Sequence, residues 1–300
     1  MKRLHTFNEF LNEGRGDPRD LTANQMDFLN KYTGKGNWYY TEEREINVAG
    51  KVDIDDLHSL QQLPVQFGTV SGDFILKGCY ALKTLKGCPR RVTGDFKLDN
   101  CQAITTLEGG PQKVKHYQII NAKELKSLKG ISQEMDGAMV IELCPQLTSL
   151  EGLPEHLEGS FNLLSCKKVK SLKSDLKKID GTYRVTDSYV TSLEGMPLSV
   201  GKSVKLLECH NLKSLEGIAT EIGWALEVYE CSNLASLKGP KLIKGNVDIF
   251  DCSSLNDEES KLVEGDYDVD LLKSWFQSGI SIEDFLHKKR GTIKGKEFGF

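Results

Sequence analysis

A leucine that recurs every 21 or 22 residues constrains this chain more than any other feature. It usually opens a short Leu-x-Gly motif, and the positions in phase are Leu85, Leu107, Leu128, Leu150, Leu172, Leu193, Leu215 and Leu237. A period of this length is typical of a solenoid, in which each unit buries its apolar face only by stacking on its neighbours. The chain is therefore predicted to form an elongated stack of coils.

Each repeat also contains two apolar residues separated by one other residue, which is the alternation of a short, half-buried strand. Ten such pairs begin at positions from Val52 to Val247. A cysteine stands three residues after the pair in seven repeats, at Cys79, Cys101, Cys144, Cys166, Cys209, Cys231 and Cys252. Ala122 replaces it once, and the repeat of Tyr183 is out of step by one residue. We predict ten parallel strands, with the cysteines as buried, reduced thiols.

Glycines occur at two points of the repeat. One set belongs to the Leu-x-Gly motif, and the other precedes the strands, at Gly50, Gly72, Gly94, Gly137, Gly159, Gly181 and Gly245. Both sets are predicted to reverse the chain with a positive φ, which glycine reaches without steric cost. Because the repeat is too short for a long helix, its other side is predicted as turns, extended chain or brief 3₁₀ segments.

The order apolar-x-apolar-x-x-Cys-x-x-Leu resembles the leucine-rich repeat, in its variant with cysteine at the asparagine position. A narrower resemblance is to a family of phage-encoded leucine-rich repeat proteins, over residues 20–256. It rests on units of the type L-T-S-L-E-G-x-P and on these earlier residues: Leu21, Gln25, Phe28 to Thr33, Gly36, Trp38, Val52 to Asp55, and Phe67 to Phe74. The resemblance implies a curved solenoid with parallel strands on its concave face. Family units are often near-identical copies, whereas these have diverged, and no activity transfers to any residue.

The predicted fold is thus a mostly β, α/β-type repeat solenoid with a parallel concave sheet and helical caps at both ends. Residues 1–15 form an amphipathic peptide, 16–50 an N-terminal cap, 51–256 the solenoid and 257–300 a helical C-terminal cap. A helix is expected from Asp20 or Thr22 to near Gly34. Another is expected from about Asp270 and, after a break near Gly279, a last one from Ser281 that Gly291 ends.

The first residues allow two interpretations. Leu4, Phe7, Phe10 and Leu11 fall on one face of a helix. The segment resembles the short peptides that large tailed phages place on proteins destined for the capsid interior, which end in a Leu-x-Glu cleavage site. Leu11-Asn12-Glu13 would be that site. The other interpretation is an amphipathic helix that docks on the end of the solenoid.

Composition and motifs argue against several classes of function. The net charge is −4, so no global field draws the chain to nucleic acid or to an anionic membrane. No apolar stretch approaches the roughly 18 residues of a membrane span. The chain has no nucleophile elbow, phosphate-binding loop or zinc motif, so we expect no catalysis, cofactor or metal. Cysteines without a disulfide pattern favour a reducing compartment, either host cytoplasm or phage capsid interior.

The candidate binding residues come from the alternation of the strands. The second outward-facing row reads Asp55, Lys77, Asp99, Ile120, Glu142, Leu164, Thr186, Leu207, Tyr229 and Phe250. Its later part is largely apolar and is bordered by Glu208, Glu230 and Asp251. Such a stripe favours a protein-binding surface for a partner of unknown identity. Two alternatives stay open: the chain's own C-terminal helices cover the stripe, or the protein is a virion component carried in the capsid by its N-terminal peptide.

Overall fold

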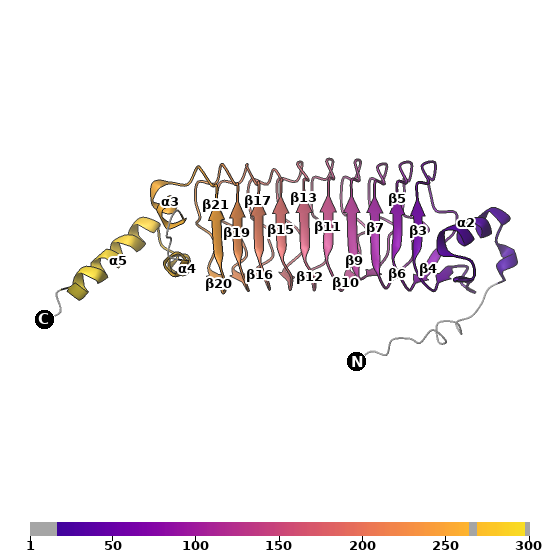
Figure 1. The fold of residues 1–300 in the computed structure, drawn as a ribbon, viewed down its shortest axis with the longest axis horizontal. Helices are drawn as coiled ribbons and strands as arrows, with labels where there is room; N and C mark the ends of the chain where they lie inside the picture. The colour runs from indigo at the N-terminus through magenta and orange to yellow at the C-terminus, as the bar shows by residue number, and fades with distance from the viewer. Residues whose placement is uncertain (1–16, 264–268, 298–300) are drawn as a thin grey trace, which may run out of the picture.

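The computed structural model describes residues 17–263 and 269–297, and over this range the chain winds into an elongated solenoid of parallel strands (Figure 1). One repeat of the sequence makes one coil. The predicted peptide of residues 1–15, with Leu11-Asn12-Glu13, lies outside the described residues. The structure therefore leaves both interpretations of that peptide as they stand.

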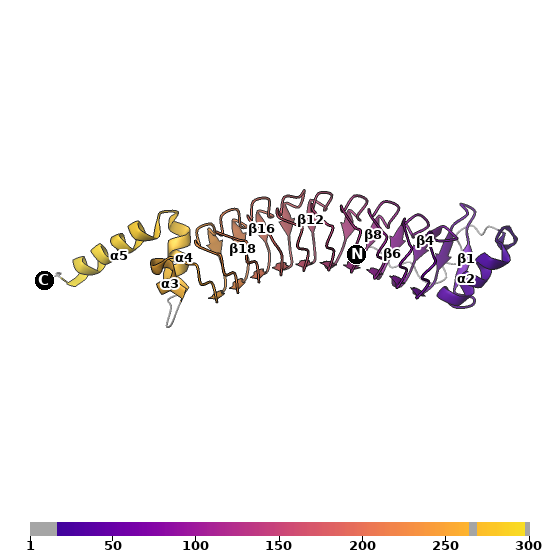
Figure 2. The ribbon, with the colours of Figure 1, turned by 90° about the horizontal axis from the view of Figure 1, so that it is seen from above.

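The longest sheet has ten strands in the order of the chain, as the sequence predicts. They are β3 (Val52–Asp55), β5 (Phe74–Lys77), β7 (Asp95–Asp99), β9 (His116–Ile120), β11 (Met139–Glu142), β13 (Phe161–Leu164), β15 (Tyr183–Thr186), β17 (Val204–Leu207), β19 (Leu226–Tyr229) and β21 (Val247–Phe250). All neighbouring pairs are parallel and in register. The whole stack bends, and this sheet lies on the inner side of the bend (Figure 2).

The outer side of each coil is more regular than the sequence predicts, because short strands pair there as well. One sheet contains β1 (Trp38–Tyr40), β2 (Ile46–Val48), β4 (Phe67–Val70), β6 (Arg91–Val92), β8 (Lys113–Val114) and β10 (Glu134–Met135). The second contains β12 (His156–Leu157), β14 (Lys178–Ile179), β16 (Ser199–Val200), β18 (Glu221–Ile222) and β20 (Leu242–Ile243). Only β1 and β2 pair antiparallel. Equal coil length brings these segments side by side, so their backbone groups bond between coils.

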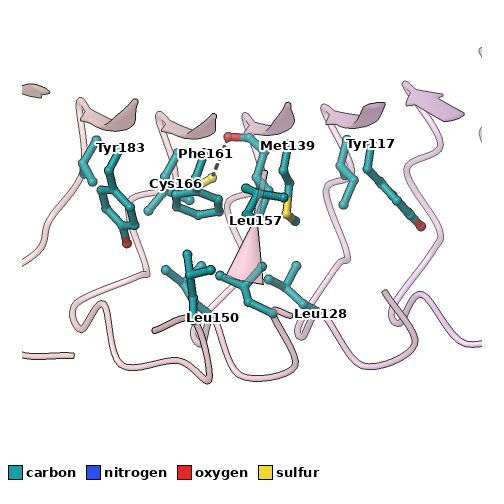
Figure 3. Close-up of a cluster of buried hydrophobic side chains, with 14 of the residues drawn as sticks. Tyr117, Leu128, Met139, Leu150, Leu157, Phe161, Cys166 and Tyr183 are labelled. Atoms are coloured by element: carbon teal, nitrogen blue, oxygen red, sulfur yellow. Dashed lines mark hydrogen bonds between the residues drawn. The ribbon is translucent and has the colours of Figure 1, made fainter. Parts of the chain in front are cut away.

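The core is a single stack of side chains between the two walls. The first apolar residue of each inner strand contributes one column, in which Phe74 stacks on Phe96 with ring centroids 5.8 Å apart. Phe96 is followed by Tyr117 at 4.9 Å. The recurring leucines, such as Leu128 and Leu150, form the facing column (Figure 3) and are fully buried. Contacts between neighbouring coils thus bury these side chains, as expected for a solenoid.

A left-handed residue follows each of the ten inner strands. The residues with positive φ at this position are Asp56, Gly78, Asn100, Asn121, Leu143, Ser165, Asp187, Glu208, Glu230 and Asp251. The turn directs the chain out of the sheet, while the amide still bonds to the next coil, as Asn121 does to the Glu142 carbonyl at 2.9 Å. Asparagine, aspartate and glycine tolerate this conformation, but leucine and glutamate do so at a cost.

The two sets of glycines have different roles. Those of the Leu-x-Gly motif have positive φ as predicted, for example 97° at Gly152. The prediction of a positive φ is wrong for most of the glycines before the strands, because only Gly50 among them has a positive φ. These glycines are required by close contact between coils, since a Cβ on Gly159 would lie 2.1 Å from the carbonyl carbon of Gly137.

The N-terminal helix is α2 (Ala23–Thr33), which follows a 3₁₀ turn at Pro18–Asp20. Thr22 begins it through a capping box with Gln25, and it ends before Gly34, as predicted. The Gln25 side chain also donates to the Pro64 carbonyl at 2.7 Å. Helix α2 contacts β3, the first strand of the inner sheet.

Three helices follow the last coil: α3 (Asp257–Val263), α4 (Val269–Ser278) and α5 (Ile282–Glu297). The break at Gly279 and the start after Ser281 agree with the sequence, and Ser281 accepts from the Asp284 amide at 3.1 Å. The predicted end at Gly291 is wrong, since one glycine costs a helix only about 1 kcal/mol. Helix α3 contacts β21 and α4 contacts β20.

Glu259 of α3 continues the coil hydrogen bonding where the repeats stop. Within the solenoid the Leu107 amide bonds to the Lys129 carbonyl of the next coil at 2.9 Å. Leu237 has the same position in the last repeat, and its amide donates instead to the Glu259 carboxylate at 3.3 Å. Ser236 donates to the same carboxylate at 3.1 Å. A side chain thus replaces the carbonyl of the missing coil.

Replacing Leu143 with asparagine should stabilise the protein, because asparagine accepts the left-handed φ of 54° at this exposed site. The expected gain in the free energy of unfolding is about 0.5–1 kcal/mol, measured by thermal or urea denaturation. The matched control is Leu198→Asn, at an exposed leucine without a positive φ, which should change little. Equal effects of the two substitutions would contradict the assignment of strain.

Burial raises the pKa of the Glu259 carboxyl above its ordinary value. The folded protein then holds this proton more tightly than the unfolded chain, so stability falls as the pH rises from the ordinary carboxyl range through the raised pKa. Glu259→Gln should remove this term, and its melting temperature relative to the natural protein should rise as the pH increases above the ordinary carboxyl range of about pH 4. Glu283→Gln, at an exposed glutamate, is the control. A difference that does not vary with pH would contradict the prediction.

Candidate partner-binding surface on the inner sheet

The inner sheet presents two rows of outward-facing side chains, as the alternation predicts. In β19 the core residues Leu226 and Val228 are fully buried, whereas Glu227 and Tyr229 are partly exposed. The two members of each apolar pair thus build the core, and the residue between them and the residue after them face the inner side of the bend. All five apolar candidate residues stand directly after the second member of such a pair.

Three of the candidate residues form one contiguous group. The register places Leu207 beside Tyr229, and Tyr229 beside Phe250. The two aromatic rings lie 5.7 Å apart between centroids, with planes at 42°. Phe250 is 52% exposed, although large apolar side chains are seldom left open to solvent. We call Leu207, Tyr229 and Phe250 the apolar group.

The other two apolar candidates do not join this group directly. Leu164 pairs with Thr186, which in turn pairs with Leu207, so one polar strand position separates it from the group. Ile120 is further away, since Glu142 lies between it and Leu164. The row thus has a continuous apolar end at β17 to β21 and a mixed middle.

The acidic border follows the apolar group at the turn. Glu208, Glu230 and Asp251 are exposed and have φ values of 54°, 56° and 56°. Their backbones continue the ladder, since the Glu208 amide donates to the Tyr229 carbonyl at 2.9 Å. Within the described chain none of the three carboxylates forms an ion pair. The sequence indicated these acids but not their conformation, which Asp56, Gly78 and two asparagines at the same slot could have signalled.

Several charges elsewhere on the sheet form ion pairs. Lys51 pairs with Asp53 at 2.9 Å, and Lys97 with Asp99 at 3.4 Å, both in the N-terminal half. Near the apolar group, Lys205 pairs with Glu227 at 2.7 Å. Consequently the acidic border is a local excess of negative charge, while the row on the other side of the apolar group contains a neutralised pair.

The C-terminal helices lie beyond the last coil (Figure 1) and contact β20 and β21. They leave Phe250 the most exposed member of the apolar group, at 52%. A side chain that formed the seat of these helices would be buried, as Trp275 and Phe276 of α4 are. The exposure of Phe250 therefore favours an external partner over internal packing.

Seven cysteines form an internal row directly beneath the turn, and all eight cysteines of the chain, Cys88 included, are buried and free of disulfides. Cys166 donates to the Leu164 carbonyl at 3.4 Å and to the Ile141 carbonyl of the preceding coil at 3.9 Å (Figure 3). In the out-of-step repeat, Ser188 takes the slot and donates to Thr186 at 3.2 Å. The row therefore anchors the turn, and a hydroxyl can replace the thiol.

The described chain contains no group of three or more histidine, cysteine or acidic side chains that could hold a metal ion. None of its helices has the length and apolar character needed to cross a membrane. No protein-family model, curated protein or solved structure matches the sequence or the fold.

The native protein should react very slowly with thiol reagents. Burial raises the pKa of Cys88, and hydrogen bonding to Cys209 together with burial raises the pKa of Cys231 to about 12, although the bond to Cys252 acts in the opposite direction. Hydrogen bonding to Cys101 lowers the pKa of Cys79, and hydrogen bonding to Cys166 lowers that of Cys144, but both thiols are fully buried. Because reagents reach only exposed thiolates, labelling with iodoacetamide should proceed only on unfolding.

Mass spectrometry should count eight alkylated cysteines after denaturation in guanidinium and few before it. Fast labelling of several cysteines in the native protein would contradict the buried row. Fewer than eight free thiols after denaturation without reductant would contradict the absence of disulfides.

Proposed function

We propose that this protein is a non-catalytic interaction module that binds a protein partner on its concave inner sheet. The observation that carries the proposal is the apolar group, in which half-exposed Phe250 lies against Tyr229 and beside Leu207. Glu208 and Glu230, with Asp251, add a charged rim to one side. An apolar centre with a polar rim is the usual anatomy of a protein interface.

The proposed surface has few but suitable anchors. Aromatic side chains give most of the binding energy at interfaces, and truncating one that is desolvated on binding typically costs about 2 kcal/mol or more. Tyr229 and Phe250 are such side chains, and Leu207 and Leu164 extend the contact along the row. Ile120 would contribute only to a partner that reaches past Glu142.

Two structural details belong to the same proposal. The parallel inner ladder and the cysteine row support kinship with the leucine-rich repeat, in the phage-encoded group that the sequence resembles. Helix α2 at one end, and α3 and α4 at the other, would serve as caps that protect the terminal coils from pairing with other chains. The carboxylate of Glu259 supports this role at the C-terminal end.

The test is the double variant Tyr229→Ala with Phe250→Ala, compared with the natural protein as bait in an extract of the cells that make it. Because Phe250 is half exposed, the variant should lose the captured partner while its melting temperature changes little. The matched control is Tyr80→Ala with Tyr189→Ala, two tyrosines of similar exposure at the turns, which should keep the partner.

A large fall in the melting temperature of the Tyr229/Phe250 variant would assign these side chains to internal packing, as large-to-small core substitutions show. Capture of the same proteins by natural bait and by the variant would exclude the apolar group as a binding site. Both results count against the proposal, and they are separated by the thermal measurement.

A second candidate rests on the sequence of the N-terminal peptide. We propose as the alternative that Leu11-Asn12-Glu13 is a maturation site and that the protein is a component of a phage head. Mass spectrometry of purified virions should then find the chain with a new N-terminus at Gly14. A chain that is absent from virions would reject this alternative and would favour the host cytoplasm. A chain that begins at Met1 in virions would reject the maturation site.

A further inference from the structure

We infer that the partner presents an amphipathic α-helix with basic residues along one flank, lying along the apolar group and parallel to the axis of the solenoid. This inference rests on the proposed function and specifies the partner at the same surface. Three observations support it: the spacing of the anchors, the paired backbone of the sheet, and the charge of the border.

The spacing of the anchors suits a helix. Neighbouring strands lie about 4.8 Å apart, so Leu207, Tyr229 and Phe250 form a row with that step. A helix advances about 5.4 Å per turn and places residues of one face at nearly the same step. An extended segment places same-face residues about 6.8 Å apart and loses this match after one residue.

The row is also long enough for several turns. From Leu164 to Phe250 there are four strand steps, about 19 Å, which equals three to four turns of helix. Thr186 interrupts the apolar row at its second position, but its small side chain leaves room for a helix to pass. This path lies on the inner side of the bend (Figure 2).

The backbone of the sheet favours a helix for a separate reason. Strand β19 pairs on both sides, with β17 and with β21, so its amides and carbonyls are already used within the ladder. An extended segment crossing this face would find no backbone partners and would leave its own polar groups unpaired. A helix satisfies its backbone internally and offers only side chains.

The border determines the charge of the partner. Glu208, Glu230 and Asp251 follow one another on successive coils without ion pairs in the described chain, so their mutual repulsion would be relieved by basic side chains. On the other flank Lys205 and Glu227 already pair at 2.7 Å, and Asp248 beside Glu227 is a single acid without an ion pair in the described chain. A bound helix should therefore carry lysine or arginine along the flank that faces the acids.

Three synthetic peptides of about 14 residues test the inference against the full chain. The first has leucines at helical spacing and lysine elsewhere, the second replaces every lysine with glutamate, and the third alternates leucine and lysine, a strand pattern. Binding is measured by fluorescence anisotropy at about 0.15 M salt, where distant charges are screened. The dissociation constant of the first peptide should be lower than that of either other peptide by about tenfold or more.

Protein variants assign the binding to the surface. Tyr229→Ala with Phe250→Ala should lower the affinity for the basic helical peptide about tenfold or more. Tyr80→Ala with Tyr189→Ala should leave this affinity unchanged. Glu208→Lys with Glu230→Lys should reverse the preference toward the acidic helical peptide. Absence of binding, equal binding of the alternating peptide, or an unchanged preference in the charge-reversal variant would overturn the inference.

The two proposals fail in different ways. Suppose that the natural partner is captured through Tyr229 and Phe250 but the protein prefers neither the helical pattern nor the lysine peptides. The binding function then stands and the helix inference is wrong. If neither the partner nor the peptides depend on the two aromatic residues, both are wrong.

Discussion

The backbone hydrogen bonds between successive coils are the interaction on which the rest of this structure depends. They hold only if every residue lies beside its counterpart one coil later, so they constrain the length of every repeat. Where a repeat has 21 residues, the loss falls in a turn. Two residues, Thr93 and Gly94, connect β6 to β7, whereas Lys115 alone connects β8 to β9. The strands on either side therefore keep their register.

This register converts one position of the repeat into one row of the solenoid. Buried positions become the column that contains Phe74, Phe96 and Tyr117, the leucine column and the cysteine row. Together they make a continuous core. Exposed positions become rows on the inner sheet, where no packing determines the residue type. The change from the charged fourth positions at Asp55 and Lys77 to Tyr229 and Phe250 is therefore not required by the fold. It is the feature that a binding function explains best.

The sequence predicted what the period alone determines. The ten strands, their direction, the buried cysteines and the Thr22 cap all follow from spacing and local chemistry. It did not predict the left-handed turn residues, because Leu143 or Glu208 at that slot follows from the ladder and opposes local preference. The apolar candidates were found by alternation, but only the register shows that Leu207, Tyr229 and Phe250 are continuous while Leu164 is separate.

Other features required the coordinates for physical reasons. The outer strands from β6 onward are only two residues long, too short for alternation to be visible in the sequence. The glycines before the strands are explained by contact with the neighbouring coil and not by their own conformation, as Gly159 shows. In the sequence Glu259 does not differ from the many other acids. The structure shows that it lies one period after Leu237 and accepts the hydrogen bonds that a further coil would accept.

The most direct test of the account is the deletion of one whole coil, residues 165–186, which joins Leu164 to Asp187. The cut positions are equivalent, since Leu164 and Thr186 pair in register and the residues after them both have positive φ. The measurement is the thermal unfolding of this variant beside one that lacks half a coil, residues 165–175. The account predicts a cooperative transition for the first and none for the second. Loss of cooperative unfolding in the whole-coil variant, or its survival in the half-coil variant, would contradict the claim that register between coils determines this structure.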